Sequence, residues 1–208
     1  MPVLNCEIHF GVSGLENSSL MDQFYPADLP EDWRLSYYSN EFSSIVVKLS
    51  DIDADLSMSE GSISAAITEL LEEIDGEDFV LLFDLSELPA NTKQALQSLE
   101  TENRNFAKAN SYYIDLQAML IETLGKDSLL KEKTPENSLT FQWGDINGNL
   151  LCYVQDNQAI EPVMLKKLLE IVRQQAKNEN IESAIVIFSS AQNALQNCRN
   201  AIVLERMM

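Results

Sequence analysis

The chain has 208 residues, of which 45% are hydrophobic and 23% charged, so it is long enough to bury the core of one globular domain. Its 33 acidic and 14 basic residues give a formal net charge of −19, which argues against a polyanionic partner such as nucleic acid. No apolar run approaches the length of about twenty residues that a membrane span needs, so no membrane partner is expected either.

The first third of the chain predicts two strands on either side of an aromatic segment. The strands are Asn5–Gly11 and Ser44–Leu49, and the segment Phe24–Phe42 between them is rich in large rings. Rings of this kind are more typical of core packing than of a cofactor site. The single histidine, His9, lies inside the first strand, where a hydrogen-bonded core residue is expected. One histidine also excludes a histidine-rich metal site.

An acidic stretch follows these elements. From Leu49 to Thr92 the chain holds twelve acidic residues and neither Lys nor Arg. We interpret the stretch as a solvated surface, and the alternative is an interaction surface for a basic protein partner. Asp51, Asp53 and Asp55 alternate like the first ligands of an EF-hand loop, but the positions that require Gly and Glu hold other residues. Apolar residues at helical spacing predict a helix over Ser62–Asp75.

The rest of the chain alternates strands with helices, a pattern typical of an α/β domain with a largely parallel sheet. The predicted helices are Glu161–Asn178 and about Gln192–Arg206, and the polar stretch Gly125–Ser138 is predicted as a loop. Asn147-Gly148 favours a tight hairpin, so the two strands that it joins are expected to form an antiparallel excursion. The predicted strands of this part are Phe79–Leu85, Ser111–Gln117, Leu139–Trp143, Leu150–Gln155 and Ser183–Ser189.

The cysteines and the N-terminal sequence bear on the compartment. Cys6, Cys152 and Cys198 are scattered without the spacing of metal ligands, so they are predicted to be free thiols. The first residues lack the basic flank, apolar core and small-residue cleavage site of a secretory signal. Both observations predict a cytoplasmic protein.

Short motifs in a fixed order connect the predicted elements to a known family. They are GVSGL from Gly11, FYP from Phe24, LSYYSNEF from Leu35, LLFDLSELP from Leu81, YYIDLQAM from Tyr112 and IFSS from Ile187. In this order they resemble YecE-like proteins, the domain of unknown function 72, over nearly the whole chain. The resemblance implies a TIM-barrel-like (β/α) fold with a mostly parallel sheet, reduced or irregular because family members are usually longer. It implies a single YecE-like barrel domain over residues 1–208, in which Tyr37 and Tyr38 would anchor the first βα loop and helix against the sheet.

Most polar positions of the family carry other residues in this chain. The family's Glu, Asn, Gln, Glu, Arg, Asn and Asn correspond here, in that order, to Val46, Lys48, Asp84, Asp115, Gln117, Ser189 and Ser190. An arginine that could clamp an anion is therefore missing from the Glu-x-Arg position, and Gln cannot replace its charge. Barrels place their chemistry at the carboxyl ends of strands, so these positions define the candidate site.

The candidate site divides into catalytic and ligand-binding residues. The two carboxylates of this set fall near the ends of consecutive strands, where they could share a proton or hold a hard divalent cation. The alternative is that one carboxylate caps a helix and the other pairs with a surface lysine. No metal site is predicted, and the sequence names no cofactor. The candidate catalytic residues are Asp84, Asp115 and Lys48, and the candidate ligand-binding residues are Gln117, Ser189 and Ser190.

The function expected from these replacements is that of a YecE-like protein that has lost the family's polar site and is non-catalytic or altered. The alternative is an enzyme, such as a metal-dependent hydrolase, that acts on a small polar or phosphorylated compound at the strand ends. The chain contains no nucleophile elbow and no Rossmann or P-loop spacing. We therefore expect no hydrolase activity on simple phosphate esters or glycosides, and either a small polar ligand or a basic protein as partner.

Overall fold

The computed structural model describes residues 6–15, 18–48, 70, 74, 78–86, 110–114, 119–125, 138–146, 148–155, 158–189 and 192–208. The chain falls into two compact units. The terminal unit comprises Met1–Ser13 with Met119–Met208, and the inner unit comprises Gly14–Ala118. The predicted helix Ser62–Asp75 and the predicted loop Gly125–Ser138 lie largely outside the described residues. The prediction of a single domain stays a prediction.

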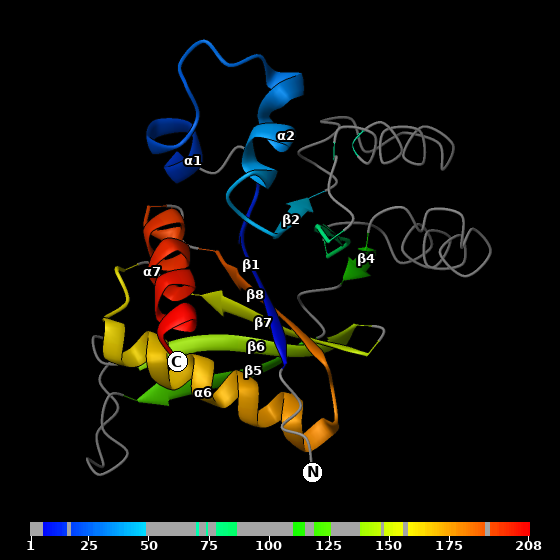
Figure 1. Ribbon diagram of the computed structural model, residues 1–208, viewed down its shortest axis with the longest axis vertical. Coiled ribbons are helices and arrows are strands. Elements are labelled where there is room, and N and C mark those ends of the chain that lie inside the picture. The colour runs from blue at the N-terminus through cyan, green and yellow to red at the C-terminus, as the bar shows by residue number, and fades with distance from the viewer. Residues whose placement is uncertain are drawn as a thin grey trace, which may run out of the picture. The chain divides into compact units, whose positions relative to one another are not determined.

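The terminal unit is built on a mixed sheet (Figure 1). β1 and β8 pair in parallel, and β8 and β7 do so as well. β7 and β6 pair antiparallel, and so do β6 and β5. The strand order is β1 (Glu7–Ser13), β8 (Ser183–Phe188), β7 (Asn149–Gln155), β6 (Ser138–Ile146) and β5 (Leu120–Gly125).

The predicted hairpin joins the antiparallel strands β6 and β7. Ile146 and Asn149 are register partners at the ends of β6 and β7, so the turn has two residues. Gly148 has φ +83°, a backbone conformation that residues with a Cβ rarely adopt. The Gly148 amide donates to Asp145 Oδ1 over 3.4 Å. The antiparallel excursion predicted at Asn147-Gly148 is therefore confirmed.

The predicted fold class, a mostly parallel TIM-barrel-like domain, is wrong. β5, β6 and β7 form an antiparallel meander, whereas neighbouring strands of a TIM barrel are parallel and are joined by helices. The part of the chain that the structure describes contains four α-helices, fewer than such a barrel requires. The α/β class itself is correct. β5 occupies a run for which the sequence predicted no strand, and this strand extends the hairpin into a meander.

Two helices of the terminal unit pack on each other and lie on the same face of its sheet (Figure 1). α6 (Pro162–Glu179) begins with a proline in its first turn and ends at Asn180, whose φ of 57° gives a left-handed cap. α7 is Ala194–Met207. No described helix is long and apolar enough to span a membrane. The buried side of α6 consists of Met164, Leu165, Leu168, Leu169, Val172 and Ala176.

A buried asparagine ties α7 to the loop that precedes α6. The Asn197 side chain is 1% exposed. Its Oδ1 accepts a hydrogen bond from the Ile160 amide over 2.9 Å, and its Nδ2 donates to the Gln158 carbonyl over 3.1 Å. Two backbone groups of the loop are thereby satisfied by one side chain, which explains why a polar residue is kept in this core.

The described part of the inner unit contains three parallel strands and a short helical segment. The strand order is β4 (Asn110–Ile114), β3 (Val80–Asp84) and β2 (Ser44–Lys48). Successive side chains of β2 and β3 are buried, so both faces of these strands are covered. The helical segment consists of α1 (Ser18–Gln23), the 3-10 turn η1 (Glu31–Trp33) and α2 (Arg34–Ser39).

The aromatic segment packs α2 against the strands of the inner unit. Tyr38 is fully buried, and its ring centroid lies 4.8 Å from that of Phe42 and 6.2 Å from that of Phe79. The Tyr38 hydroxyl donates to the Ser44 carbonyl at the start of β2 over 2.9 Å. The anchoring role is thus confirmed for Tyr38. Tyr37 packs only in part, because its side chain is 40% exposed.

Candidate functional site

Two of the predicted catalytic residues lie side by side in the inner unit. Lys48 and Asp84 are the last residues of β2 and β3 and are register partners in the parallel pair. Register partners on neighbouring strands project from the same face of a sheet. Asp84 is 5% exposed, and Lys48 is half-buried. The ends of the two strands therefore bring an acid and a base together.

The Asp84 carboxylate also closes the turn that follows β3. Its Oδ1 accepts a hydrogen bond from the Ser86 amide over 3.0 Å and another from the Ser86 hydroxyl over 2.6 Å. This is the local pattern in which an aspartate bonds to the backbone two residues further on. Oδ1 of the Asp84 carboxylate is therefore occupied by two hydrogen bonds within the turn.

The remaining predicted site residues are divided between undescribed positions and the other unit. Asp115, Gln117 and Ser190 lie outside the described residues. β3 and β4 are neighbours with Asp84 opposite Ile114, as expected for consecutive strands. A meeting of the two carboxylates stays a prediction. Ser189 belongs to the terminal unit, whereas Asp84 belongs to the inner unit.

Ser189 fastens the end of β8 to β7. Its amide donates to the Val154 carbonyl over 3.0 Å, and its hydroxyl donates to the same oxygen over 2.9 Å. The hydroxyl oxygen keeps its capacity to accept a hydrogen bond. Ser189 is half-buried and lies at the carboxyl ends of the parallel strands β8 and β7.

A row of uncharged polar side chains lies at this end of the terminal unit. Tyr153 on β7 is level with Ile187 on β8 and with Gly11 on β1, and it is opposite Gln142 on β6. Because side chains alternate between faces, residues two positions further along β1 and β7 project from the same face as Tyr153. We call this set the strand-end row: Ser13, Gln142, Tyr153 and Gln155, with Ser189 directly after β8.

Hydrogen bonds connect the strand-end row across the sheet. The Tyr153 hydroxyl donates to Ser13 Oγ over 3.1 Å, which joins β7 to β1 across the width of β8. Gln155 Nε2 donates to Gln142 Oε1 over 3.1 Å, which joins β7 to β6. Tyr153 is 6% and Gln142 5% exposed, so two members of the row are buried. Buried polar side chains on a sheet face are informative because they must be compensated.

Of this row only Ser189 was predicted as a site residue, although the sequence contains a signal for another part of it. In the run Leu139–Trp143 apolar residues alternate with Thr140 and Gln142, which predicts a polar face for β6. The bond between Tyr153 and Ser13 links positions 140 residues apart. No local pattern could indicate such a contact.

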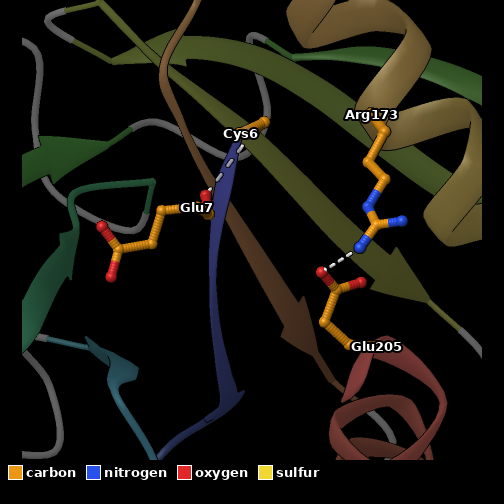
Figure 2. Close-up of polar contacts among 4 residues, drawn as sticks. All are labelled: Cys6, Glu7, Arg173 and Glu205. Carbon is orange, nitrogen blue, oxygen red and sulfur yellow. Dashed lines mark hydrogen bonds and ion pairs between the residues drawn. The ribbon is translucent and has the colours of Figure 1, made fainter. Parts of the chain in front are cut away.

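Cys6 lies in the terminal unit, where neighbouring charges act on its thiol. Figure 2 shows Cys6 beside the ion pair in which Arg173 Nη2 approaches Glu205 Oε1 to 2.5 Å. Burial raises the pKa of the Cys6 thiol, Glu205 raises that pKa further, and Arg173 lowers it in part. Cys152 and Cys198 are buried, and all three cysteines are free, as predicted.

The described acids, thiols and histidine also give no metal site. Within the described ranges no group of three or more His, Cys, Asp or Glu side chains is placed to hold a metal ion. His9 is buried in β1, as expected of a core residue, and is four residues before Ser13. At about 3.3 Å per residue, His9 is therefore about 13 Å from Ser13 along the strand, so it is not part of the strand-end row.

No protein-family model matches this chain, and no curated protein sequence matches it either, so the resemblance to YecE-like proteins stays a prediction.

Proposed function

We propose that this protein, a divergent relative of YecE-like proteins, is a non-catalytic binding protein that takes a small uncharged polar ligand at the strand-end row. The observation that carries the proposal is the row itself: hydroxyl and amide side chains on one face, near the carboxyl ends of the parallel strands β1, β7 and β8, with Gln142 beside them on the antiparallel strand β6. Ligands of α/β sheets commonly bind at the carboxyl ends of the strands. The connected row offers donors and acceptors in fixed positions.

The chemistry of the row favours binding over catalysis. It contains two serines, two glutamines and a tyrosine, none of which is a charged acid or base at neutral pH. General acid–base catalysis needs a group whose pKa lies near the working pH, and stabilisation of a developing charge needs charged or strongly polarised donors. Hydroxyls and amides suit a ligand that has the same groups, such as a sugar, a polyol or a nucleoside.

A thermal shift screen of the full chain tests this function. The probes are uncharged monosaccharides, polyols and nucleosides, each with a charged counterpart such as the sugar phosphate. A ligand at a hundred times its Kd stabilises the folded state by about 2.7 kcal/mol, which is several degrees for a chain of this size. We expect the uncharged member of at least one pair to give this shift and its charged counterpart to give less.

Matched serine variants locate the binding site. Ser189→Ala and Ser13→Ala should remove the ligand-induced shift. Ser183→Ala should retain it, because Ser183 lies at the opposite end of β8. Tyr153→Phe should also lose the shift, since it removes the bond to Ser13. A shift that persists in all three row variants would refute the proposal, and so would stabilisation by charged compounds alone.

A second candidate function is supported by the register of Lys48 and Asp84. An ammonium group and a carboxylate at adjacent strand ends are the groups that an acid–base enzyme acting on a small polar or phosphorylated compound requires. A screen with phosphate esters and glycosides tests this alternative, with Asp84→Asn as the active-site variant and Asp145→Asn, an exposed acid, as the control. Turnover that Asp84→Asn abolishes and Asp145→Asn retains would favour the enzyme.

A further inference from the structure

Two large aromatic side chains are exposed on the helical segment of the inner unit. Trp33, the last residue of η1, is 63% exposed, and Tyr37 on α2 is 40% exposed. They are four residues apart in a continuous helical stretch, so they lie on the same side of it. Exposed tryptophan and tyrosine side chains are the residues most enriched among the energetic centres of protein interfaces.

Packing beneath Tyr37 holds this side of the surface in place. The Tyr37 ring lies edge-on to Phe24, with centroids 5.2 Å apart, and its centroid is 6.3 Å from that of Tyr25. The Arg34 guanidinium lies 6.0 Å from the Tyr25 ring centroid and 3.6 Å from Glu31. A preorganised aromatic surface loses little conformational entropy when a partner binds.

The charge around the pair indicates the chemistry of the partner. Between Ser18 and Phe42 the only basic residue is Arg34, whose side chain is 18% exposed. A second copy of this chain would bring more negative charge, because each copy has a net charge of −19. Arginine and lysine side chains of a partner would instead suit both the acids and the exposed rings, because they attract carboxylates and stack on aromatic faces. The exposed acids of the segment are Asp22, Asp28, Glu31, Asp32 and Glu41.

We propose that the surface of this helical segment, with the exposed rings of Trp33 and Tyr37 and the exposed acids Asp28 and Asp32 close to them in sequence, binds an arginine- or lysine-rich segment of a partner protein; we call this surface the aromatic-acidic face. The rings contact the guanidinium planes or aliphatic stems of the partner, and the carboxylates attract its charge. The face belongs to the inner unit, so this inference does not depend on the ligand proposed for the terminal unit.

Fluorescence anisotropy with a labelled peptide of alternating Arg and Gly tests the inference, and a peptide of alternating Glu and Gly is the control. We expect the full chain to bind the Arg peptide alone, and to bind it more weakly as the salt concentration rises. The chain contains two tryptophans, Trp33 and Trp143, so in the Trp143→Phe variant the emission reports on Trp33. That emission should change when the Arg peptide binds.

Matched variants separate this face from the general negative charge of the protein. Trp33→Ala and Tyr37→Ala should each weaken Arg-peptide binding by about tenfold. Val163→Ala should leave binding unchanged, because Val163 is exposed to the same 63% but lies on α6. Trp33→Leu keeps apolar area without a ring and should behave like Trp33→Ala. Equal affinity of the parent, Trp33→Ala and Tyr37→Ala would overturn the inference, and so would equal weakening in Val163→Ala.

Discussion

Two tyrosines of the inner unit should respond in opposite directions to the loss of a hydroxyl group. Tyr38 is fully buried, and its hydroxyl donates to the Ser44 carbonyl over 2.9 Å. Tyr25 is 8% exposed, and its buried hydroxyl has no hydrogen-bond partner among the described protein groups. Burial raises the pKa of the Tyr25 phenol, and Arg34 offsets this rise in part. Replacement by Phe removes the hydroxyl from either position and keeps the ring.

The expected magnitudes follow from what each hydroxyl does. Tyr38→Phe loses a buried hydrogen bond to a backbone carbonyl, which costs about 1 to 2 kcal/mol of unfolding free energy. Tyr25→Phe removes a polar group that is desolvated without compensation, so stability should rise by about 1 kcal/mol. Ring packing changes little in either variant, because the aromatic contacts of both residues involve ring carbons.

Urea denaturation measures both effects on one scale. Both residues lie in the inner unit, so the transition of that unit reports on both variants even if the two units unfold separately. The midpoint should move to lower urea for Tyr38→Phe and to higher urea for Tyr25→Phe, with unchanged slopes. Tyr37→Phe is the control and should change stability by less than about 0.5 kcal/mol, because its side chain is 40% exposed. Equal destabilisation by Tyr25→Phe and Tyr38→Phe would refute the reasoning.

Three further predictions concern the terminal unit. Asn197→Ala should lower the unfolding free energy by about 2 kcal/mol in a thermal melt, since it removes two hydrogen bonds to the backbone of the loop before α6. Gly148→Ala should cost about 1 kcal/mol through its φ of +83° alone, because nothing lies within 4 Å of the added Cβ, and Gly148→Asn should cost less. Cys6 should react more slowly with iodoacetamide at pH 8 than a free cysteine does, because its raised pKa reduces the thiolate fraction. Glu205→Gln should speed this alkylation, and Arg173→Gln should slow it. The raised pKa stabilises the fold below the pKa of the unfolded thiol, and this contribution is lost as the pH rises through the folded pKa.

The sequence predicted the individual elements better than their directions in the sheet. Runs such as Ser44–Lys48 and Ser183–Phe188 are short, apolar and β-branched, and the structure forms strands there. β5 was missed because the chain has neither Gly nor Pro between Asn110 and Leu124, so no turn signal separates β4 from β5. Without β5 the antiparallel meander is reduced to one hairpin, and a parallel barrel remained compatible with the pattern.

The candidate sites also contain some contacts that local sequence patterns predict and others that they do not. The bond from Ser86 to Asp84 spans two residues, and an aspartate followed two positions later by serine is a local turn pattern. The adjacency of Lys48 and Asp84 follows from two consecutive parallel strands that end together, and the register confirms it. The bond between Tyr153 and Ser13 depends on the order of β1, β8 and β7. That order is a property of the folded sheet and not of any segment.

Position at a strand end is therefore a weak guide to function unless the hydrogen-bonding capacity of the side chain is also known. Asp84 and Ser189 were both selected for their position, and both donate or accept bonds that fasten neighbouring backbone. Removing such a residue would lower stability whether or not it binds a ligand, so loss of function in a single variant proves little. Ser183 is the first residue of β8, and Ser189 directly follows its last residue, so the two serines lie at opposite ends of one strand. A difference between their alanine variants in ligand-induced stabilisation, measured relative to each variant's own melting temperature, separates binding at the strand-end row from support of the fold.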